Sequence, residues 1–209
     1  MNTQIKEEVK QRKNEIFRDQ EKLYSRFSEL VEQVIHARII ADAMWKFRHD
    51  RGIKTGFGNS VISFSHVALE NFVVLQLFKL FDRKYSVFNV WDVAQNLTHP
   101  NLLIWLEEKF VTIKKDFDLI SEWRHVIVGH RGETGYFVSE EFEKKFTEAR
   151  ISEKRLRDFL LEFLCQIKFE MQRIKTRKTM EGFNFRIDSF GSYIKKEMAE
   201  TFKYFETRE

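Results

Sequence analysis

Residues 103–127, LIWLEEKFVTIKKDFDLISEWRHVI, contain the pattern that decides the fold class. Apolar side chains recur there at steps of three and four, which places them on one face of an α-helix of about seven turns at ~3.6 residues each. The apolar positions are Leu103, Leu106, Phe110, Ile113, Phe117, Ile120, Trp123 and Ile127. The stretch therefore predicts a long amphipathic helix. Gly129 predicts its end, because glycine readily adopts a left-handed C-cap.

The N-terminal half of the chain shows the same kind of periodicity. A first long helix is expected through Leu23 and on to Phe47, and residues 50–56 interrupt it with two glycines. Apolar residues wrap much of the circumference of residues 59–81, so we expect this helix to be the central and most buried one. Ser86 is placed to N-cap a short helix that follows.

The C-terminal half continues the pattern. A helical stretch is expected to begin at Ser139, and residues 153–178 form a second long amphipathic helix with a strongly basic end. Residues 183–205 are less regular, and either pack on the bundle or pair with a second copy of the chain. With no strong strand signal, the sequence predicts an all-α fold.

The composition favours a single helical domain over residues 1–209. The chain has 43% hydrophobic residues and 22 Phe but one Pro and eight Gly, so it holds one substantial core and few residues that make turns. A net charge of +4 is compatible with a polyanionic partner but does not require one.

Cysteine usage and hydropathy predict a cytoplasmic protein. Cys165 is the only cysteine, which excludes an intrachain disulfide, and we expect it to pack as a small hydrophobe. The charged N-terminus lacks the apolar core of a signal peptide. Residues 61–81 include His66 and Glu70, so we expect no membrane span.

The segment EWRHVIVGHR, residues 122–131, is the best candidate for a functional site. It places Arg124, His125, His130 and Arg131 at the end of the clearest helix. An Arg can hold a phosphate through two parallel hydrogen bonds, and a His near neutral pH can give or take a proton. Together these groups suit cleavage of RNA.

The proposed chemistry depends on the helix ending at Gly129. In a continuous helix, positions 124 and 130 would lie about 240° apart at ~100° per residue, on different faces. If the helix stops at Gly129, the chain can fold His130 back toward Arg124.

These residues resemble the motif of the HEPN superfamily, in particular its bacterial abortive-infection branch. That motif is an Arg followed by a polar residue, with a His five to seven positions after the Arg. Arg124, His125 and His130 occupy those places, although His125 stands where Asn is usual. Upstream, the sequence LFKLFDR at residues 77–83 resembles a motif found at the end of a helix in the same branch. The resemblance covers about residues 61–131.

The resemblance implies an up-and-down helical bundle with additional N- and C-terminal helices, which dimerises with the motif at the interface. It also implies a metal-independent endoribonuclease without a cofactor, in phage defence or as the toxin of a toxin–antitoxin pair, with an antitoxin protein as a further partner. Arg124 would hold the scissile phosphate, His130 would transfer protons and His125 would assist. The alternative is a catalytically silent module that binds a nucleotide, RNA or protein.

Several other residues have more than one interpretation. Arg131, Lys175, Arg177 and Lys178 could contact the RNA backbone or be solvated charges. Arg124 could instead pair with a neighbouring Glu, and His130 could cap the helix end. Two i, i+3 or i, i+4 pairs, Glu122 with His125 and His66 with Glu70, have metal-ligand spacing, but buried hydrogen-bonded groups explain the second pair better. The four Trp are expected to be core or interface anchors: Trp45, Trp91, Trp105 and Trp123.

Overall fold

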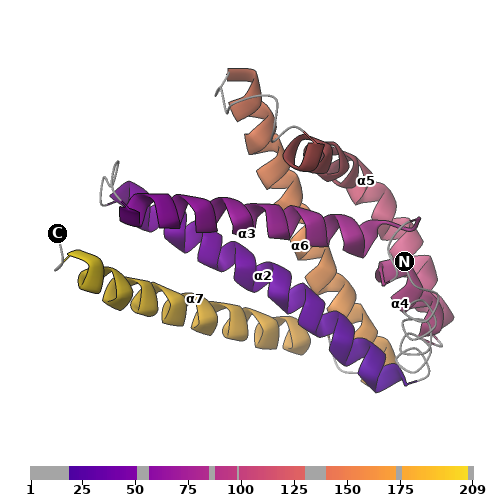
Figure 1. The fold of residues 1–209 in the computed structure, drawn as a ribbon. Coiled ribbons are helices and arrows are strands. Elements are labelled where there is room, and N and C mark those ends of the chain that lie inside the picture. The colour runs from indigo at the N-terminus through magenta and orange to yellow at the C-terminus, as the bar shows by residue number, and fades with distance from the viewer. Residues whose placement is uncertain are drawn as a thin grey trace, which may run out of the picture.

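The computed structural model describes residues 19–50, 57–84, 88–97, 99–129, 140–172 and 176–206. Within these ranges the chain is all-α, with no strand (Figure 1). This confirms the predicted fold class. The helices are α2 (Gln20–Asp50), α3 (Phe57–Phe81), α4 (Val90–Asn96), α5 (Pro100–Gly129), α6 (Glu140–Gln172) and α7 (Thr176–Glu206).

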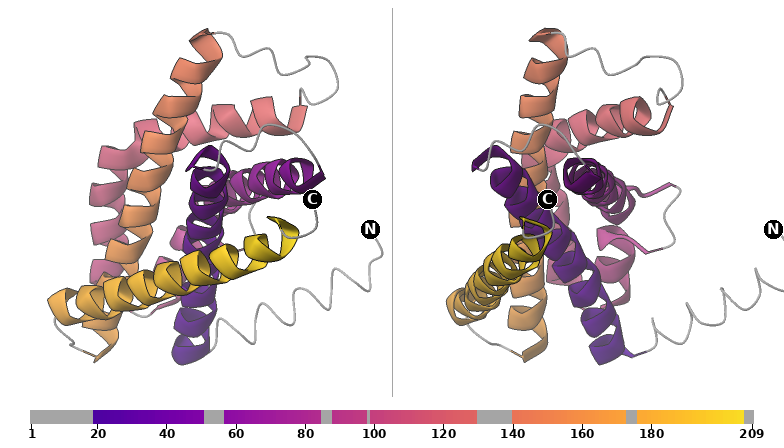
Figure 2. Two further views of the ribbon diagram at one scale, coloured as in Figure 1. Left: turned by 90° about the vertical axis from the view of Figure 1, so that its left-hand side faces the viewer. Right: turned by 60° about the vertical axis from the view of Figure 1, so that its left-hand side comes forward.

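Two antiparallel helix pairs form the body of the protein. In the first pair, α3 runs back along α2, and Arg38 meets Glu70. In the second, α6 runs back along α5, where Asp116 of α5 accepts a 2.7 Å hydrogen bond from Ser152 of α6. The short α4 packs against α5, and α7 lies across α2 on the outside of the bundle (Figures 1 and 2).

Helix starts follow local capping chemistry. The Asn89 Oδ1 accepts hydrogen bonds from the backbone N–H groups of Trp91 and Asp92, at 3.0 and 2.9 Å, and so caps α4. The prediction that Ser86 caps this helix is therefore wrong, because the helix begins at Val90. At the start of α5, Pro100 occupies the first turn, where its missing N–H costs nothing.

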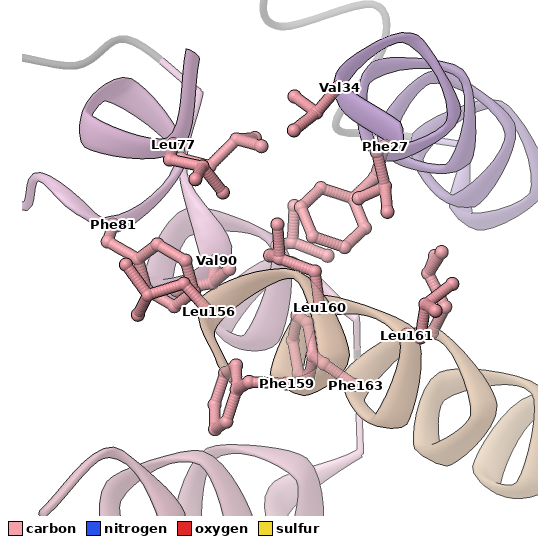
Figure 3. Packing of buried hydrophobic residues seen from close by; sticks show 14 of the residues in the cluster. Phe27, Val34, Leu77, Phe81, Val90, Leu156, Phe159, Leu160, Leu161 and Phe163 are labelled. Atoms are coloured by element: carbon pink, nitrogen blue, oxygen red, sulfur yellow. The ribbon is translucent and has the colours of Figure 1, made fainter. Parts of the chain in front are cut away.

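Aromatic rings fill much of the core, as the 22 Phe suggest. Phe27 of α2 meets Phe163 of α6 edge to face, with ring centroids 5.5 Å apart. Phe81 at the end of α3 contacts the rings of Phe110, Phe117 and Phe159. Figure 3 shows apolar side chains of α2, α3 and α6 converging on the space between these helices. Burial of each such side chain contributes about 1.5–3 kcal/mol.

The prediction that residues 59–81 form the most buried element is not confirmed, because α6 contributes at least as much to the core. α6 packs against α2, α3, α5 and α7. It is one continuous helix that ends at Gln172, not a helix of residues 153–178. Six of its side chains are fully inaccessible: Leu156, Leu160, Phe163, Leu164, Cys165 and Ile167. By contrast, Phe64 of α3 is 76% exposed.

α3 is also long and apolar enough to span a membrane. Among the helices described here, the stretch Ile62–Phe81 alone meets that condition, and a third of it is buried inside the protein. Glu70 lies within it and pairs with Arg38 at 2.7 Å. This ion pair and the apolar contacts of Val73, Leu77 and Phe81 join α3 to the rest of the bundle.

α7 is a regular helix, although the apolar pattern of residues 183–205 is less regular than in the other helices. It runs in the same direction as α2, because Arg186 meets Glu32 at 3.1 Å and Phe190 stacks on His36 with ring centroids 3.9 Å apart. Among the α7 side chains that the structure describes, only Phe183 is buried. The helix is therefore attached to the surface of the bundle, which agrees with the first of the two predicted roles.

Candidate functional site

The predicted motif lies on the last turns of α5. Arg124 and His125 are helical, and the described part of α5 extends to Gly129. His130 and Arg131 lie outside the described residues. The break after Gly129 and the return of His130 toward Arg124, on which the proposed chemistry depends, also fall there and stay predictions.

Arg124 lies over an aromatic ring. Its guanidinium carbon is 4.1 Å from the centroid of the Phe78 ring on α3. Phe78 in turn stacks on Phe117 of α5, with centroids 5.9 Å apart and planes 18° apart. A cation over a ring face is attracted by the ring quadrupole, by about 0.5–1 kcal/mol at an exposed site. The Arg124 side chain is half-buried and held at the point where α3 meets the end of α5.

Arg124 differs from the other stacked arginines in its charge partners. Three other described arginines lie over rings, and each also pairs with a carboxylate. Arg83 lies over Trp91 and pairs with Glu107. Arg150 lies over Phe146 and pairs with Asp42. Arg186 lies over Phe183 and pairs with Glu32. Within the described ranges, Arg124 has no carboxylate at ion-pair distance. The alternative that it pairs with a neighbouring Glu is not supported there.

The end of α5 is also fixed from the side of α6. The Trp123 ring lies 5.7 Å from the Phe146 ring, centroid to centroid. His125 follows Arg124 and is exposed, with no hydrogen bond or ion pair to any residue in the described part of the chain. The backbone at this position is therefore held by two aromatic contacts, while the imidazole is accessible to a ligand.

Of the basic residues predicted to contact RNA, Arg177 and Lys178 lie on a helix that begins far from Arg124. Lys175 is outside the described ranges, and Arg177 and Lys178 are in the first turn of α7, where the side chains are not described. α7 begins just after Gln172, whereas Phe146, which contacts Trp123, is near the start of α6. These two points are separated by about 39 Å of helix at ~1.5 Å per residue. Arg124 and the backbone of Arg177 and Lys178 therefore lie near opposite ends of α6.

A buried charge cluster joins α2, α3 and α6. Arg38 is 2% exposed, and its guanidinium lies 2.7 Å from Glu70 and 3.3 Å from Glu153 and also pairs with Asp42. His66 approaches Glu70 at 3.3 Å. Two more arginines complete the cluster. Arg150 forms ion pairs with Asp42 and Glu70, and Arg157 forms one with Glu153. The sequence revealed only His66 and Glu70, as a weak metal candidate or as buried polar groups.

The electrostatics support a structural role for this cluster. Burial would raise the pKa of Glu70, but contacts with His66 and Arg38 outweigh it and lower that pKa to about 2. Burial dominates at Glu153 and raises its pKa. No group of three or more His, Cys, Asp or Glu within the described ranges could hold a metal ion. The contacts of Glu70 with Arg38 and His66 agree with the interpretation of this pair as buried polar groups.

Two further features carry no chemistry of their own. Cys165 is buried as predicted, and burial raises the pKa of its thiol to about 11, which suppresses the reactive thiolate.

A groove of about 600 Å³ lies between α5, α6 and α7. Its charged rim is satisfied internally by the pairs Lys109–Glu162, Arg155–Asp116 and Lys154–Asp158.

The prediction that all four Trp side chains are core or interface anchors holds for three of them. Trp91 is buried, and Trp105 and Trp123 pack against the core, as predicted. Trp45 is 50% exposed and stacks on His49 near the end of α2, so it is not a core residue.

Comparison with known proteins identifies no relative. No protein-family model matches the chain. No curated protein and no solved structure matches it either.

Proposed function

We propose that this chain is a metal-independent endoribonuclease of the HEPN type, acting in phage defence or as a toxin, with its site at the end of α5. The observation that supports the proposal is the state of Arg124. Its guanidinium is half-buried and stacked on Phe78, and it lacks the carboxylate that the other stacked arginines have in the described structure. A positioned, uncompensated guanidinium is suited to bind a phosphate.

The chemistry needs two kinds of group. The ribose 2′-oxygen attacks phosphorus while its proton passes to a base, and the bond to the 5′-oxygen breaks as an acid supplies a proton to that oxygen. Arg124 would stabilise the charge on the non-bridging oxygens. His130 would transfer protons and the exposed His125 would assist. The products carry a 2′,3′-cyclic phosphate and a 5′-hydroxyl.

The proposed assembly is a homodimer, with RNA as substrate and an antitoxin protein as a further partner. Dimerisation would bring two copies of the α5 end together, as the HEPN resemblance implies. Sedimentation of the purified chain tests this expectation independently of activity.

Cleavage of total tRNA and mRNA by the purified chain in EDTA tests the proposal. We expect Arg124→Ala and His130→Ala each to reduce cleavage by about 10²- to 10⁴-fold, and His125→Ala to reduce it less. Arg48→Ala is the matched control, because Arg48 is exposed near the end of α2 and has no carboxylate partner in the described structure. Cleavage that survives the substitutions of Arg124 and His130 would defeat the assigned site.

A second candidate is a catalytically silent module that binds a nucleotide, RNA or protein at the same place. It is favoured by His125, since no described group fixes its imidazole, whereas Arg124 needs only to bind an anion. In this case wild-type chain binds RNA without cutting it, and Arg124→Ala weakens binding while Arg48→Ala does not.

A further inference from the structure

The contacts beneath Arg124 form a continuous aromatic series. Phe81 is 1% exposed in the core and lies 6.2 Å from Phe117 between ring centroids. Phe117 stacks on Phe78, and Phe78 lies beneath the Arg124 guanidinium at 4.1 Å. The series thus leads from the interior to a half-buried cation, so the guanidinium is supported from below by packed rings.

A guanidinium has two flat faces and an edge of N–H donors. In Arg124 one face is occupied by Phe78, and the edge has no carboxylate in the part of the chain that the structure describes. Flat guanidinium groups stack on nucleobases as well as on aromatic side chains. The side chain can therefore hold a phosphate with its edge and a base with its second face.

We propose that the second face of the Arg124 guanidinium is a stacking platform for one unpaired nucleobase next to the bound phosphate. The inference rests on the proposed function in that RNA is the ligand, and it assigns Phe78 as the residue that positions the platform. A base within a duplex is already stacked on both sides, so the platform selects an unpaired nucleotide.

Binding of a non-cleavable RNA separates this inference from the nuclease activity. The probe is a short 2′-O-methyl RNA, which lacks the attacking hydroxyl, with a single abasic nucleotide placed at each position in turn. We expect one abasic position to weaken binding about tenfold, as loss of one stacked base does. The phosphates are unchanged throughout the series, so backbone contacts cannot produce this difference.

Two variants assign the effect to the platform. Arg124→Lys keeps the charge but has no flat face, so it should bind intact and abasic RNA with the same reduced affinity. Phe78→Leu should likewise reduce the difference in affinity between intact and abasic RNA. Phe64→Leu is its matched control, because Phe64 is on the same helix and 76% exposed. Circular dichroism and thermal melting verify that each variant is folded.

The outcomes distinguish the two proposals. The platform is overturned if wild type binds the intact and all abasic probes with equal affinity. It is also overturned if the difference between intact and abasic probes survives Arg124→Lys. Neither result bears on cleavage, which is measured separately. Base-dependent binding without cleavage of unmodified RNA supports the platform and defeats the nuclease. No binding of any RNA overturns both.

Discussion

Arg38 of α2 and Glu153 of α6 are separated by 115 residues in the sequence, yet their side chains lie 3.3 Å apart and are each 2% exposed. Glu70 of α3 contacts the same guanidinium at 2.7 Å. One arginine thus joins three helices of the bundle in the interior. A charge in that position is tolerated only with its partners present, because an unpaired buried charge is costly.

Replacing Arg38 should therefore destabilise the fold strongly. We expect Arg38→Met to lower the free energy of unfolding by about 3–5 kcal/mol, since it leaves Glu70 and Glu153 without their central cation. Urea unfolding measures the change. Arg186→Met is the control, because Arg186 is 60% exposed and its pair with Glu32 should contribute less than about 1 kcal/mol. Equal losses in the two variants would contradict the assigned role of Arg38.

Glu70 should make stability depend on acid pH. Its pKa is lowered from 4.5 to about 2, so its stabilising contribution is complete above pH 4.5 and is lost as the pH falls toward 2. The shift corresponds to roughly 3 kcal/mol at ~1.4 kcal/mol per unit. Glu153 has a raised pKa and acts in the opposite direction.

Unfolding curves between pH 5 and about 2 test this dependence. We expect Glu70→Gln to flatten the decline in stability on the acid side. Glu29→Gln is the matched change on the exposed face of α2, where Glu29 pairs with Arg26. A wild-type profile that Glu70→Gln leaves unchanged would exclude Glu70 as its source.

Asn89 should stabilise the start of α4. We expect Asn89→Ala to lower the free energy of unfolding by about 1–2 kcal/mol, because two backbone N–H groups lose their acceptor. Its amide also donates to the Asp82 carbonyl at 3.2 Å, which ties α4 to the end of α3. Asn101→Ala on the exposed start of α5 should change stability by less than about 0.5 kcal/mol. Thermal melting of the two variants makes the comparison.

Gly182 in α7 is a site for stabilisation. A methyl group there would meet no atom within 4 Å other than the adjacent backbone of its own helix, so alanine fits without displacing a neighbour. We expect Gly182→Ala to raise the free energy of unfolding by about 1 kcal/mol through its higher helix propensity. A decrease measured in urea would show that α7 is not a stable helix in solution.

Periodicity predicted α2, α3 and α5 because each has an apolar stripe at helical spacing. It predicted a helical stretch from Ser139 but not that this stretch continues into the next helix as one α6, since residues 140–150 are mostly charged and bury Ala149 alone among the side chains described there. The cluster around Arg38 was not predictable either. Its members lie on three separate helices, and a charge in an amphipathic sequence looks like a surface charge until its tertiary neighbours are known.

The candidate site was predictable in part. The position of Arg124 and His125 on the last described turns of a long helix followed from one short segment. The position of Arg124 over Phe78 depends on how α3 crosses α5, which no local pattern in the sequence encodes. Likewise, the separation of Arg177 and Lys178 from Arg124 arises from the length of α6.

The shallow attachment of α7 bears on how such a chain can evolve. Since Phe183 is its one buried side chain among those described, the interior enclosed by α2 to α6 is nearly complete without it. We expect that an ancestor or shortened descendant ending near residue 172 could fold unaided. Natural variation in this lineage should then accumulate first in the final helix, where gain, loss or replacement disturbs least.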